Sequence, residues 1–471
     1  MNYASFLRNL YKIHYENAPK MLEICTVGGY EEVGKNCTAI NVDGEVVILD
    51  MGLHLGKYIA YTEENEDVYD LSPKQLIQMG AVPDISAIED WRRDVKAIVP
   101  THAHLDHIGA IPFLAKKFDA PIICTPYSKA VLEAILKDEG IKIDNEIKPV
   151  NPNSRLKISP NIDIEFINMT HSTPQTAMVA IHTRYGIIIY ANDFKFDNLP
   201  VLGKKPNFRR LKELGKEGVL CLILDSIYAG SAKKTPSETV AREMLKDVML
   251  GTGSRGKAVI VTTFSSHLAR LKSIIEFGKK MNRKIVFMGR SLCKYVGAGE
   301  DIKIINFSKS VELVRFKDKM RKKLKKIGEK KDKYLLVVTG HQGEPKSVLS
   351  RIVNGQFPFK LGKGDHVIFS CTIIPDEINK RNREIMEEKL REAGVRIFKD
   401  IHVSGHCARE DQRDLIDLVK PRHIIPAHGG RDMTEAMVEL AEELGYKNEE
   451  TVHIMNDSKR IKFDLSRMKV V

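Results

Sequence analysis

Apolar and polar positions alternate in two different ways along the chain. Up to about residue 225, short apolar runs are separated by loops rich in glycine and polar residues, which is typical of paired strands. From Val219 onward, strand-length apolar runs alternate with amphipathic helical segments, for example a strand at 257–263, a helix at 267–281 and a strand at 284–288. This alternation predicts a mostly parallel sheet. We therefore predict an α/β protein with a sheet sandwich followed by a βαβ region.

Two segments depart from this regular alternation. Residues 54–94 are polar and interrupted by proline and glycine, and they are predicted to form an inserted loop or lid. Residues 311–327 place apolar side chains at helical spacing among many lysines, which predicts one amphipathic helix with a strongly positive face. A solvated helix face is the simpler interpretation of that segment, and an RNA-binding face is the alternative.

Side chains that bind metals concentrate directly after the predicted strands. The apolar run at 97–99 is followed within eight residues by three histidines and an aspartate, and imidazole and carboxylate are ligands that zinc-like ions prefer. One loop cannot satisfy two ions, so other strand ends must supply further ligands. The candidate ligands are His102, His104, Asp106, His107, His171, Asp193 and His428.

These candidates divide into two ligand sets with one shared member. One ion would be held by His102, His104 and His171, and the other by Asp106, His107 and His428. Asp193 can bridge both ions because a carboxylate has two oxygens. Asp50, which ends another predicted strand, is placed to accept a proton from a ligand imidazole. Two ions roughly 3.5–4 Å apart can acidify a shared water and hold phosphoryl oxygens. We predict two zinc ions, and manganese accepts the same ligands.

The composition limits the kinds of binding partner and the cellular compartments that are compatible with the sequence. The 74 lysines and arginines against 62 acidic residues give a net charge of +12, which suits an anionic partner such as nucleic acid, although heat-adapted proteins show a similar balance. The seven cysteines are scattered and never spaced C-x-x-C, which indicates a reducing compartment. No apolar run is long enough to span a membrane, and residues 1–20 lack a signal-peptide core. We expect a cytoplasmic protein without a membrane anchor.

The ligand pattern resembles the metallo-β-lactamase superfamily. Its H-x-H-x-D-H sequence corresponds to 102–107, and the 235 positions between Asp193 and His428 leave room for the β-CASP domain of nucleic-acid-processing members. The segments 224–226, 404–406 and 426–429 resemble the three β-CASP motifs. The segments 27–36, 192–197 and 339–345 further resemble the ribonuclease J family, in the archaeal form that lacks the bacterial C-terminal domain.

The resemblance implies a fold and an activity. It implies an αββα sandwich with an inserted β-CASP domain, divided into an N-terminal extension at 1–20, the sandwich at 21–225 and 401–471, and the insertion at 226–400. It also implies 5′→3′ exonuclease activity on single-stranded RNA with a 5′-monophosphate. In that reaction Asp106 would orient the attacking hydroxide, His406 would stabilise the phosphoryl oxygen, and Asp225 would lie behind the ligands. The implied 5′-phosphate pocket comprises His402, Val403, Ser404, Gly405 and His406.

Other functions fit parts of the same pattern. An endoribonuclease that processes RNA 3′ ends would share the fold and the ligands. A small-molecule lactone or thioester hydrolase would use the same metals but has no need of the insertion or the basic balance. A catalytically inactive RNA-binding subunit would not need all seven ligands. A homodimer is also compatible with the sequence.

Overall fold

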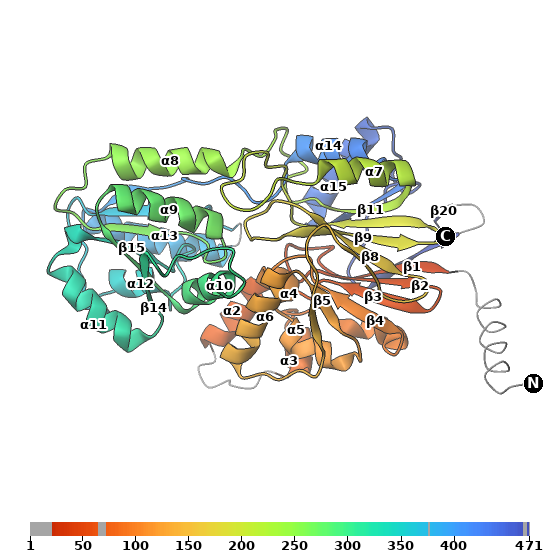
Figure 1. Ribbon diagram of the computed structural model, residues 1–471, viewed down its shortest axis with the longest axis horizontal. Helices are drawn as coiled ribbons and strands as arrows, with labels where there is room; N and C mark the ends of the chain where they lie inside the picture. The colour runs from red at the N-terminus through yellow and green to blue at the C-terminus, as the bar shows by residue number, and fades with distance from the viewer. Residues whose placement is uncertain (1–20, 65–71, 375–376, 465–468, 471) are drawn as a thin grey trace, which may run out of the picture.

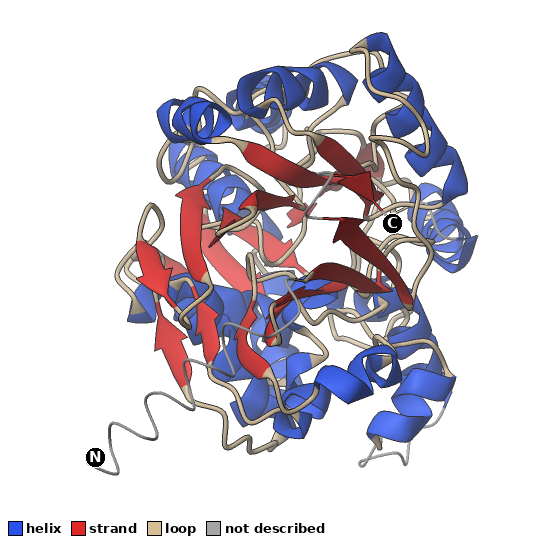
Figure 2. Ribbon diagram, turned by 90° about the vertical axis from the view of Figure 1, so that its right-hand side faces the viewer, coloured by secondary structure: helices blue, strands red, loops and turns tan. Residues whose placement is uncertain are grey.

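The computed structural model of the protein describes residues 21–64, 72–374, 377–464 and 469–470. The predicted N-terminal extension, residues 1–20, lies outside them. Three sheets organise the described chain: two form a sandwich, and the third belongs to a separate α/β unit beside it (Figure 1). Figure 2 shows the strands lying between helices above and below them.

The first sheet of the sandwich has eight strands in the order β20-β19-β1-β2-β3-β4-β5-β6. Its strands are β1 (Leu22–Gly28), β2 (Cys37–Val42), β3 (Glu45–Leu49), β4 (Val95–Val99), β5 (Ile122–Cys124), β6 (Ile147–Pro149), β19 (Lys459–Asp464) and β20 (Lys469–Val470). The second sheet has six strands in the order β18-β11-β10-β9-β8-β7. Its strands are β7 (Arg155–Lys157), β8 (Asp163–Asn168), β9 (Ala177–Thr183), β10 (Gly186–Ala191), β11 (Val219–Asp225) and β18 (His423–Ala427).

The alternation of side chains along each strand builds the αββα layers. In β3, Val47 and Leu49 enter the core between the two sheets, whereas Val46 and Ile48 face the outer helices. Helices cover both outer faces because each sheet is apolar on both sides. The helices of the sandwich are α4 (Leu105–Ile108), α5 (Ile111–Leu114), η2 (Ala115–Lys117), α6 (Pro126–Glu139), α7 (Phe208–Glu217), α14 (Arg409–Val419) and α15 (Arg431–Glu443).

The inserted unit contains a six-stranded sheet in the order β14-β13-β15-β12-β16-β17, and every pair is parallel. This confirms the βαβ pattern predicted for the region. Its strands are β12 (Val259–Thr262), β13 (Lys284–Met288), β14 (Val311–Val314), β15 (Tyr334–Val338), β16 (His366–Phe369) and β17 (Arg396–Phe398). Its helices are α8 (Glu238–Gly251), α9 (Leu268–Lys280), α10 (Arg290–Asp301), α11 (Lys317–Gly328), η3 (Lys331–Lys333), α12 (Val348–Val353) and α13 (Glu377–Glu392).

The inserted unit also packs against the sandwich through two helices. The Tyr127 hydroxyl at the start of α6 donates to the Tyr295 carbonyl of α10 at 3.3 Å. Near the other end of α6, Asp138 pairs with Lys294 of α10 at 3.1 Å and also with Arg315. The two units are therefore joined by side-chain contacts as well as by the two chain segments that cross between them.

Two sequence-based predictions about local structure are wrong. The predicted helix at 311–327 begins with strand β14, which pairs with β13, and only its second part is helix α11. Phe316, counted as an apolar helical position, is 56% exposed. The predicted loop at 54–94 contains α2 (Leu55–Glu64), α3 (Pro73–Gln78) and the 3₁₀ helix η1 (Ile85–Trp91), and it buries Leu76, Ile88 and Trp91 in the core. α11 lies at the outer end of the inserted unit (Figure 1).

Candidate metal centre

The candidate ligands meet where the carboxyl ends of the sandwich strands converge. β3 and β4 run parallel in the first sheet, so the loops after Leu49 and Val99 leave the same edge. β10, β11 and β18 are parallel neighbours in the second sheet, and β8 runs in the same direction. The residues delivered at these ends are Asp50, His102, His104, Asp106, His107, His171, Asp193, Asp225 and His428.

Three of these residues have a backbone that non-glycine residues seldom adopt. Asp50, Asp193 and His428 each follow a strand with φ of 59°, 47° and 55°. Left-handed conformations are uncommon for residues with a Cβ, and they occur at functional sites where the surroundings enforce them. Each sharp turn ends a strand and directs the side chain toward the shared centre.

The turn that carries the histidine cluster is fixed by a neighbouring loop. Backbone amides of Met51 and Leu53 donate to the carbonyls of His107 and Leu105 at 2.7 and 2.9 Å. Between them, a Cβ added to Gly52 would lie only 1.7 Å from the carbonyl oxygen of Asp106. Glycine is thus required for the close approach that orients the cluster.

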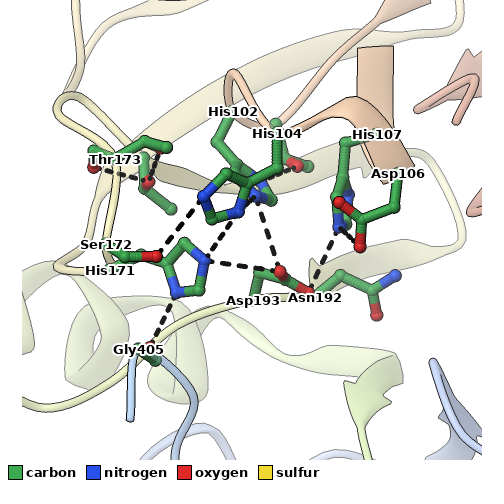
Figure 3. A network of polar contacts seen from close by, with 12 residues as sticks. His102, His104, Asp106, His107, His171, Ser172, Thr173, Asn192, Asp193 and Gly405 are labelled. Atoms are coloured by element: carbon green, nitrogen blue, oxygen red, sulfur yellow. Dashed lines mark hydrogen bonds and ion pairs between the residues drawn. The ribbon is translucent and has the colours of Figure 1, made fainter. Parts of the chain in front are cut away.

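The inward-facing ligand atoms form two sets around Asp193 (Figure 3). In the first set, Nδ1 of His104 lies 3.0 Å from Nε2 of both His102 and His171. Asp193 Oδ2 lies 3.5 and 3.4 Å from the same two Nε2 atoms. In the second set, Asp193 Oδ1 lies 3.3 Å from Nε2 of both His107 and His428. Asp106 completes this second set, with Oδ2 3.6 and 3.7 Å from these two nitrogens.

The outer ring nitrogens of the ligand histidines are held by acceptors. His107 Nδ1 donates to Asp50 Oδ2 at 2.7 Å, and His428 Nδ1 donates to Asn36 Oδ1 at 2.7 Å. His102 Nδ1 donates at 3.0 Å to the Thr101 hydroxyl, which itself donates to Asp50. A neutral imidazole carries one proton, so an acceptor on the outer nitrogen leaves the inward nitrogen with a free lone pair. This is the state that a metal ligand requires.

Burial and neighbouring charges shift the pKa values of the candidate ligands in different directions. Burial lowers the pKa of His102, His104 and His171 well below the ordinary value, which keeps these rings neutral. Burial also opposes charge on His107, but the carboxylates of Asp193, Asp50 and Asp106 outweigh it and raise the pKa of that ring. Burial raises the pKa of Asp193, yet the surrounding histidines hold it well below its usual range.

The residues fit two divalent cations. Nitrogens bound to a tetrahedral zinc at about 2.0–2.1 Å lie roughly 3.3–3.4 Å apart, close to the 3.0 Å separations found here. Asp193 Oδ1 is buried and accepts no hydrogen bond from a group in the described chain. Within that same part of the protein, no lysine or arginine pairs with Asp50, Asp106, Asp193 or Asp225. The centre therefore combines carboxylates that lack a lysine or arginine partner with imidazole nitrogens, and this donor set suits zinc or manganese.

His406 lies at the open side of this centre. Its Nδ1 is 2.9 Å from Asp225 Oδ2, and its Nε2 is 3.8 Å from Asp193 Oδ2. Burial lowers the pKa of His406, but Asp193 and Asp225 outweigh burial and raise it to about 9. The side chains of His406 and Asp106 are 21% and 28% exposed. Those of Asp193 and His428 are almost fully buried. A substrate must therefore approach from the side of His406 and Asp106.

The segment 402–406 divides into residues that face the centre and residues that do not. The Gly405 carbonyl accepts from His171 Nδ1 at 2.7 Å, and a Cβ at Gly405 would lie 2.8 Å from Cε1 of that ring. Ser404 Oγ accepts from the His406 amide at 3.0 Å. Val403 is buried, so its side chain offers nothing to a ligand. His402 lies beside Phe264, with ring centroids 6.2 Å apart, and burial lowers its pKa to about 2.

Sequence reasoning missed several residues that organise the site. Asn36 is buried, bonds to the Asp106 carbonyl through Nδ2 and accepts from His428 through Oδ1. Lys195 is also buried, and its Nζ donates to the carbonyls of Ser404 and Pro236 at 3.2 and 3.3 Å. Both lie in segments that matched the family pattern, and that match was the available signal. Thr101 and Ser266, which contact ligand histidines, gave no sequence signal.

Comparisons with known proteins agree with this architecture. Residues 30–234 match the metallo-β-lactamase superfamily, 248–387 match the ribonuclease J β-CASP domain, and 393–455 match the Zn-dependent metallo-hydrolase RNA specificity domain. A solved structure of a protein of unknown function from Enterococcus faecalis covers 94% of this chain and 100% of its own at 15% identity, with a TM-score of 0.61, which indicates a shared fold.

Closer relatives come from several organisms. Ribonuclease J of Methanocaldococcus jannaschii is 43% identical, with 94% of this chain and 99% of the relative covered. Ribonuclease J of Pyrococcus abyssi is 44% identical, with 90% and 94% covered. Ribonuclease J of a Synechocystis species is 31% identical, with 95% of this chain and 67% of the relative covered.

The sandwich, its strand-end ligands and the inserted parallel sheet define a metallo-β-lactamase-fold protein of the β-CASP class. More narrowly, the chain belongs to the ribonuclease J family. Both the fold class and the family resemblance predicted from the sequence are confirmed. None of the described helices is long and apolar enough to cross a membrane.

Proposed function

We propose that this protein is a metal-dependent ribonuclease that removes nucleotides from the 5′ end of single-stranded RNA bearing a 5′-monophosphate. Two divalent ions, zinc or alternatively manganese, would be held by the two ligand sets that share Asp193. One observation supports the proposal most directly. His171, a candidate ligand of the first set, donates through Nδ1 to the Gly405 carbonyl at 2.7 Å, which places the segment 402–406 beside the two sets. A terminal-phosphate site there would lie beside the hydrolytic centre.

The ions, when bound, would supply Lewis-acid activation of water and neutralise charge on the phosphoryl oxygens. The protein's own groups then have separate tasks. The side chain of Asp106 is 28% exposed, so its carboxylate is placed to orient the attacking water. In-line attack on phosphorus breaks the bond to O3′ of the leaving nucleotide, and the remaining RNA keeps a 5′-phosphate.

His406 is proposed to stabilise the phosphoryl oxygen as negative charge grows. Its Nδ1–H is held by Asp225 at 2.9 Å, which orients the ring and supports its positive charge. Its Nε2–H therefore points as a donor toward the exposed side of the centre. A preorganised donor aimed at developing charge is worth about 10²–10³ in rate.

The segment 402–406 is proposed to seat the terminal 5′-phosphate. Within the described chain, the amides of Ser404 and Gly405 donate to no protein group, so they remain available to an anion. The Lys195 ammonium lies 3.2 Å from the Ser404 carbonyl and adds positive charge beneath the loop. Gly405 lets the backbone approach both the phosphate and His171.

The test is hydrolysis of one RNA prepared with a 5′-hydroxyl, a 5′-monophosphate or a 5′-triphosphate. We expect the monophosphate RNA to be degraded at least about tenfold faster, with mononucleotides as the first products, because one well-placed charged hydrogen bond contributes about 1.5 kcal/mol or more. Internal fragments that form equally from all three RNAs would contradict exonuclease action and favour the endonuclease.

Two variants separate the phosphate seat from the chemistry. Ser404→Ala removes the hydroxyl that orders the loop and should reduce the monophosphate preference about 5- to 10-fold. His406→Ala should slow all three RNAs about 10²- to 10³-fold without changing the preference. Ser265→Ala is the matched control and should behave as the unmodified enzyme. The hydroxyl of Ser265 shares a hydrogen bond with that of Ser291 in the inserted unit.

A further inference from the structure

The two ligand sets differ in what holds the outer nitrogens of their histidines. In the second set, His107 and His428 bond to Asp50 and Asn36, and both acceptors belong to the first sheet of the sandwich. These partners follow or precede β-strands that are buried on both faces. The second set is therefore oriented entirely by the sandwich.

In the first set, two histidines are held from the side of the inserted unit. His171 Nδ1 donates to the carbonyl of Gly405, on the segment that returns from the insertion. His104 Nε2 lies 3.1 Å from the hydroxyl of Ser266, in the loop between β12 and α9 of the inserted sheet. Ser266 is 162 positions from His104 in sequence and is almost fully buried. A sandwich hydroxyl, that of Ser172, is farther from the same nitrogen, at 3.4 Å.

The geometry fixes the direction of the Ser266 bond. His104 Nδ1 faces the inward nitrogens of His102 and His171 at 3.0 Å, so it is the atom that would bind the ion and must be unprotonated. The single proton of the neutral ring is then on Nε2, and Nε2–H donates to the Ser266 hydroxyl oxygen. Without that acceptor the ring loses the contact that selects its tautomer and orientation.

We propose that Ser266 is a positioning residue through which the inserted unit completes the metal site of His102, His104 and His171. Retraction of the inserted unit would remove the acceptor from His104 and weaken that site, while leaving the site of Asp106, His107 and His428 intact. By linkage, ion binding at the first site favours the docked position of the insertion to the same extent. The inference rests on the two-ion binding within the proposed function, and it does not depend on which end of RNA is attacked.

The test is ion affinity, measured on the full chain without substrate. After the protein is stripped with a chelator, Zn²⁺ is returned in competition with a chromophoric chelator, and Co²⁺ absorption reports the ligand geometry. Loss of an outer partner of a ligand histidine typically costs about 10- to 100-fold in metal affinity. For Ser266→Ala we expect one of two ions to bind about 10- to 100-fold more weakly, with an altered Co²⁺ spectrum, and the other to bind as before.

Three further variants make the result specific. Ser266→Thr keeps a hydroxyl and should restore the affinity, and Ser265→Ala, one residue away, should leave both ions unaffected. Ser172→Ala should have a smaller effect than Ser266→Ala because its oxygen is farther away. Circular dichroism and thermal melting of the ion-free proteins would verify that each variant is folded.

The outcomes separate this inference from the proposed function. An unmodified protein that binds two ions, together with a Ser266→Ala variant that binds both equally well, would overturn the inference alone. The same holds if Ser172→Ala reproduces the whole loss and Ser266→Ala none of it. An unmodified protein that binds no ion at all would overturn the proposed function and this inference with it.

Discussion

Buried charge is handled differently at the sandwich edge and in the inserted unit. At the edge, each of four carboxylates pairs with at least one histidine and, within the described chain, with no lysine or arginine: Asp50, Asp106, Asp193 and Asp225. In the inserted unit, the fully buried Arg270 donates to both oxygens of Glu238 at 2.5 and 2.9 Å. Similarly, Asp365 accepts from Lys331 at 2.6 Å and from the amides of Ala258 and Gly362.

Carboxylates that are paired with lysine or arginine stabilise the fold, whereas carboxylates without such a partner can bind an added cation. A buried ion pair with all its hydrogen bonds made is locally complete and needs no other cation. A buried carboxylate that meets imidazoles instead of a lysine or arginine has no permanent cationic partner. A bound metal ion, which takes imidazoles as neutral ligands, would supply that charge. The edge of the sandwich is therefore the place where an added cation would complete the charge balance, while the inserted unit contributes an ordered hydrogen-bond partner, Ser266, to His104.

The largest effects are expected when one buried carboxylate is replaced in each region, Asp193 at the sandwich edge and Asp365 in the inserted unit. Asp193→Ala removes the ligand shared by both sets, so we expect ion content to fall from two to at most one and RNA hydrolysis to fall at least about 10³-fold. Ion content is measured by elemental analysis and hydrolysis by product release. The physical reason is that Asp193 belongs to both ligand sets of the described chain.

Asp365→Asn is the matched change in the inserted unit. It weakens bonds to Lys331 and two amides, so the free energy of unfolding should fall while the ion content stays at two. The comparison would be broken if Asp365→Asn also emptied a metal site, or if Asp193→Ala kept both ions and lost only stability.

An effect on stability, without loss of the ions, is expected when the Arg270 pair is broken. Arg270→Met leaves the Glu238 carboxylate buried without its main partner, which typically costs about 3–5 kcal/mol in the free energy of unfolding. Arg270 also donates to the Ile401 carbonyl at 3.1 Å, directly before the segment 402–406. Urea denaturation measures the loss, and the second substitution Glu238→Gln should recover part of it. A double variant that is no better than Arg270→Met would show that the pair is not what stabilises this region.

The sequence predicted that the candidate ligands gather at one place because local patterns mark their positions. Each candidate ligand follows an apolar run of strand length, and parallel strands deliver their ends to one sheet edge. His171, Asp193 and His428 could therefore be gathered with the 102–107 cluster without any knowledge of contacts. The inserted parallel sheet was predictable for the same reason, from its alternation of strands and helices.

Asp50, which accepts from His107, was predicted from its place at a strand end. Most other partners of the candidate ligands could not be predicted, because their roles depend on contacts between distant segments. Ser266 gave no local signal, and the family match at 27–36 did not indicate a role for Asn36. Only the folded chain brings these two residues to His104 and His428. The error at 311–316 has a local cause. Leu313 continues the helical spacing of Met320, yet β14 gains more by extending the sheet beside β13 than the helix would gain by one further turn.

The smallest expected effect concerns Glu165, a carboxylate of the sandwich that lies away from the candidate metal centre. It tests whether carboxylates outside that centre are paired with cationic side chains. Glu165 lies midway along β8 and accepts from His182 at 2.9 Å and from Arg210 at 2.7 and 3.0 Å. Burial raises the pKa of this carboxyl, but these two partners outweigh burial and lower it from 4.5 to about 2. A carboxyl whose pKa is lowered by folding stabilises the protein above its unfolded pKa, and this contribution disappears as the pH falls toward about 2.

Glu165→Gln should therefore lower the free energy of unfolding by about 1–2 kcal/mol at pH 7, after allowance for the partial solvent screening of the pair. The difference between the two proteins should shrink below about pH 4.5 and vanish near pH 2. Urea denaturation at pH 7, 5, 4 and 3 measures it. Glu213→Gln, which alters a more exposed partner of Arg210 at 3.3 Å, is the control and should change stability by less than about 0.5 kcal/mol. A difference that does not depend on pH would show that folding does not stabilise Glu165 as an anion. Carboxylates without effective cationic partners would then occur in the sandwich outside the candidate metal centre as well.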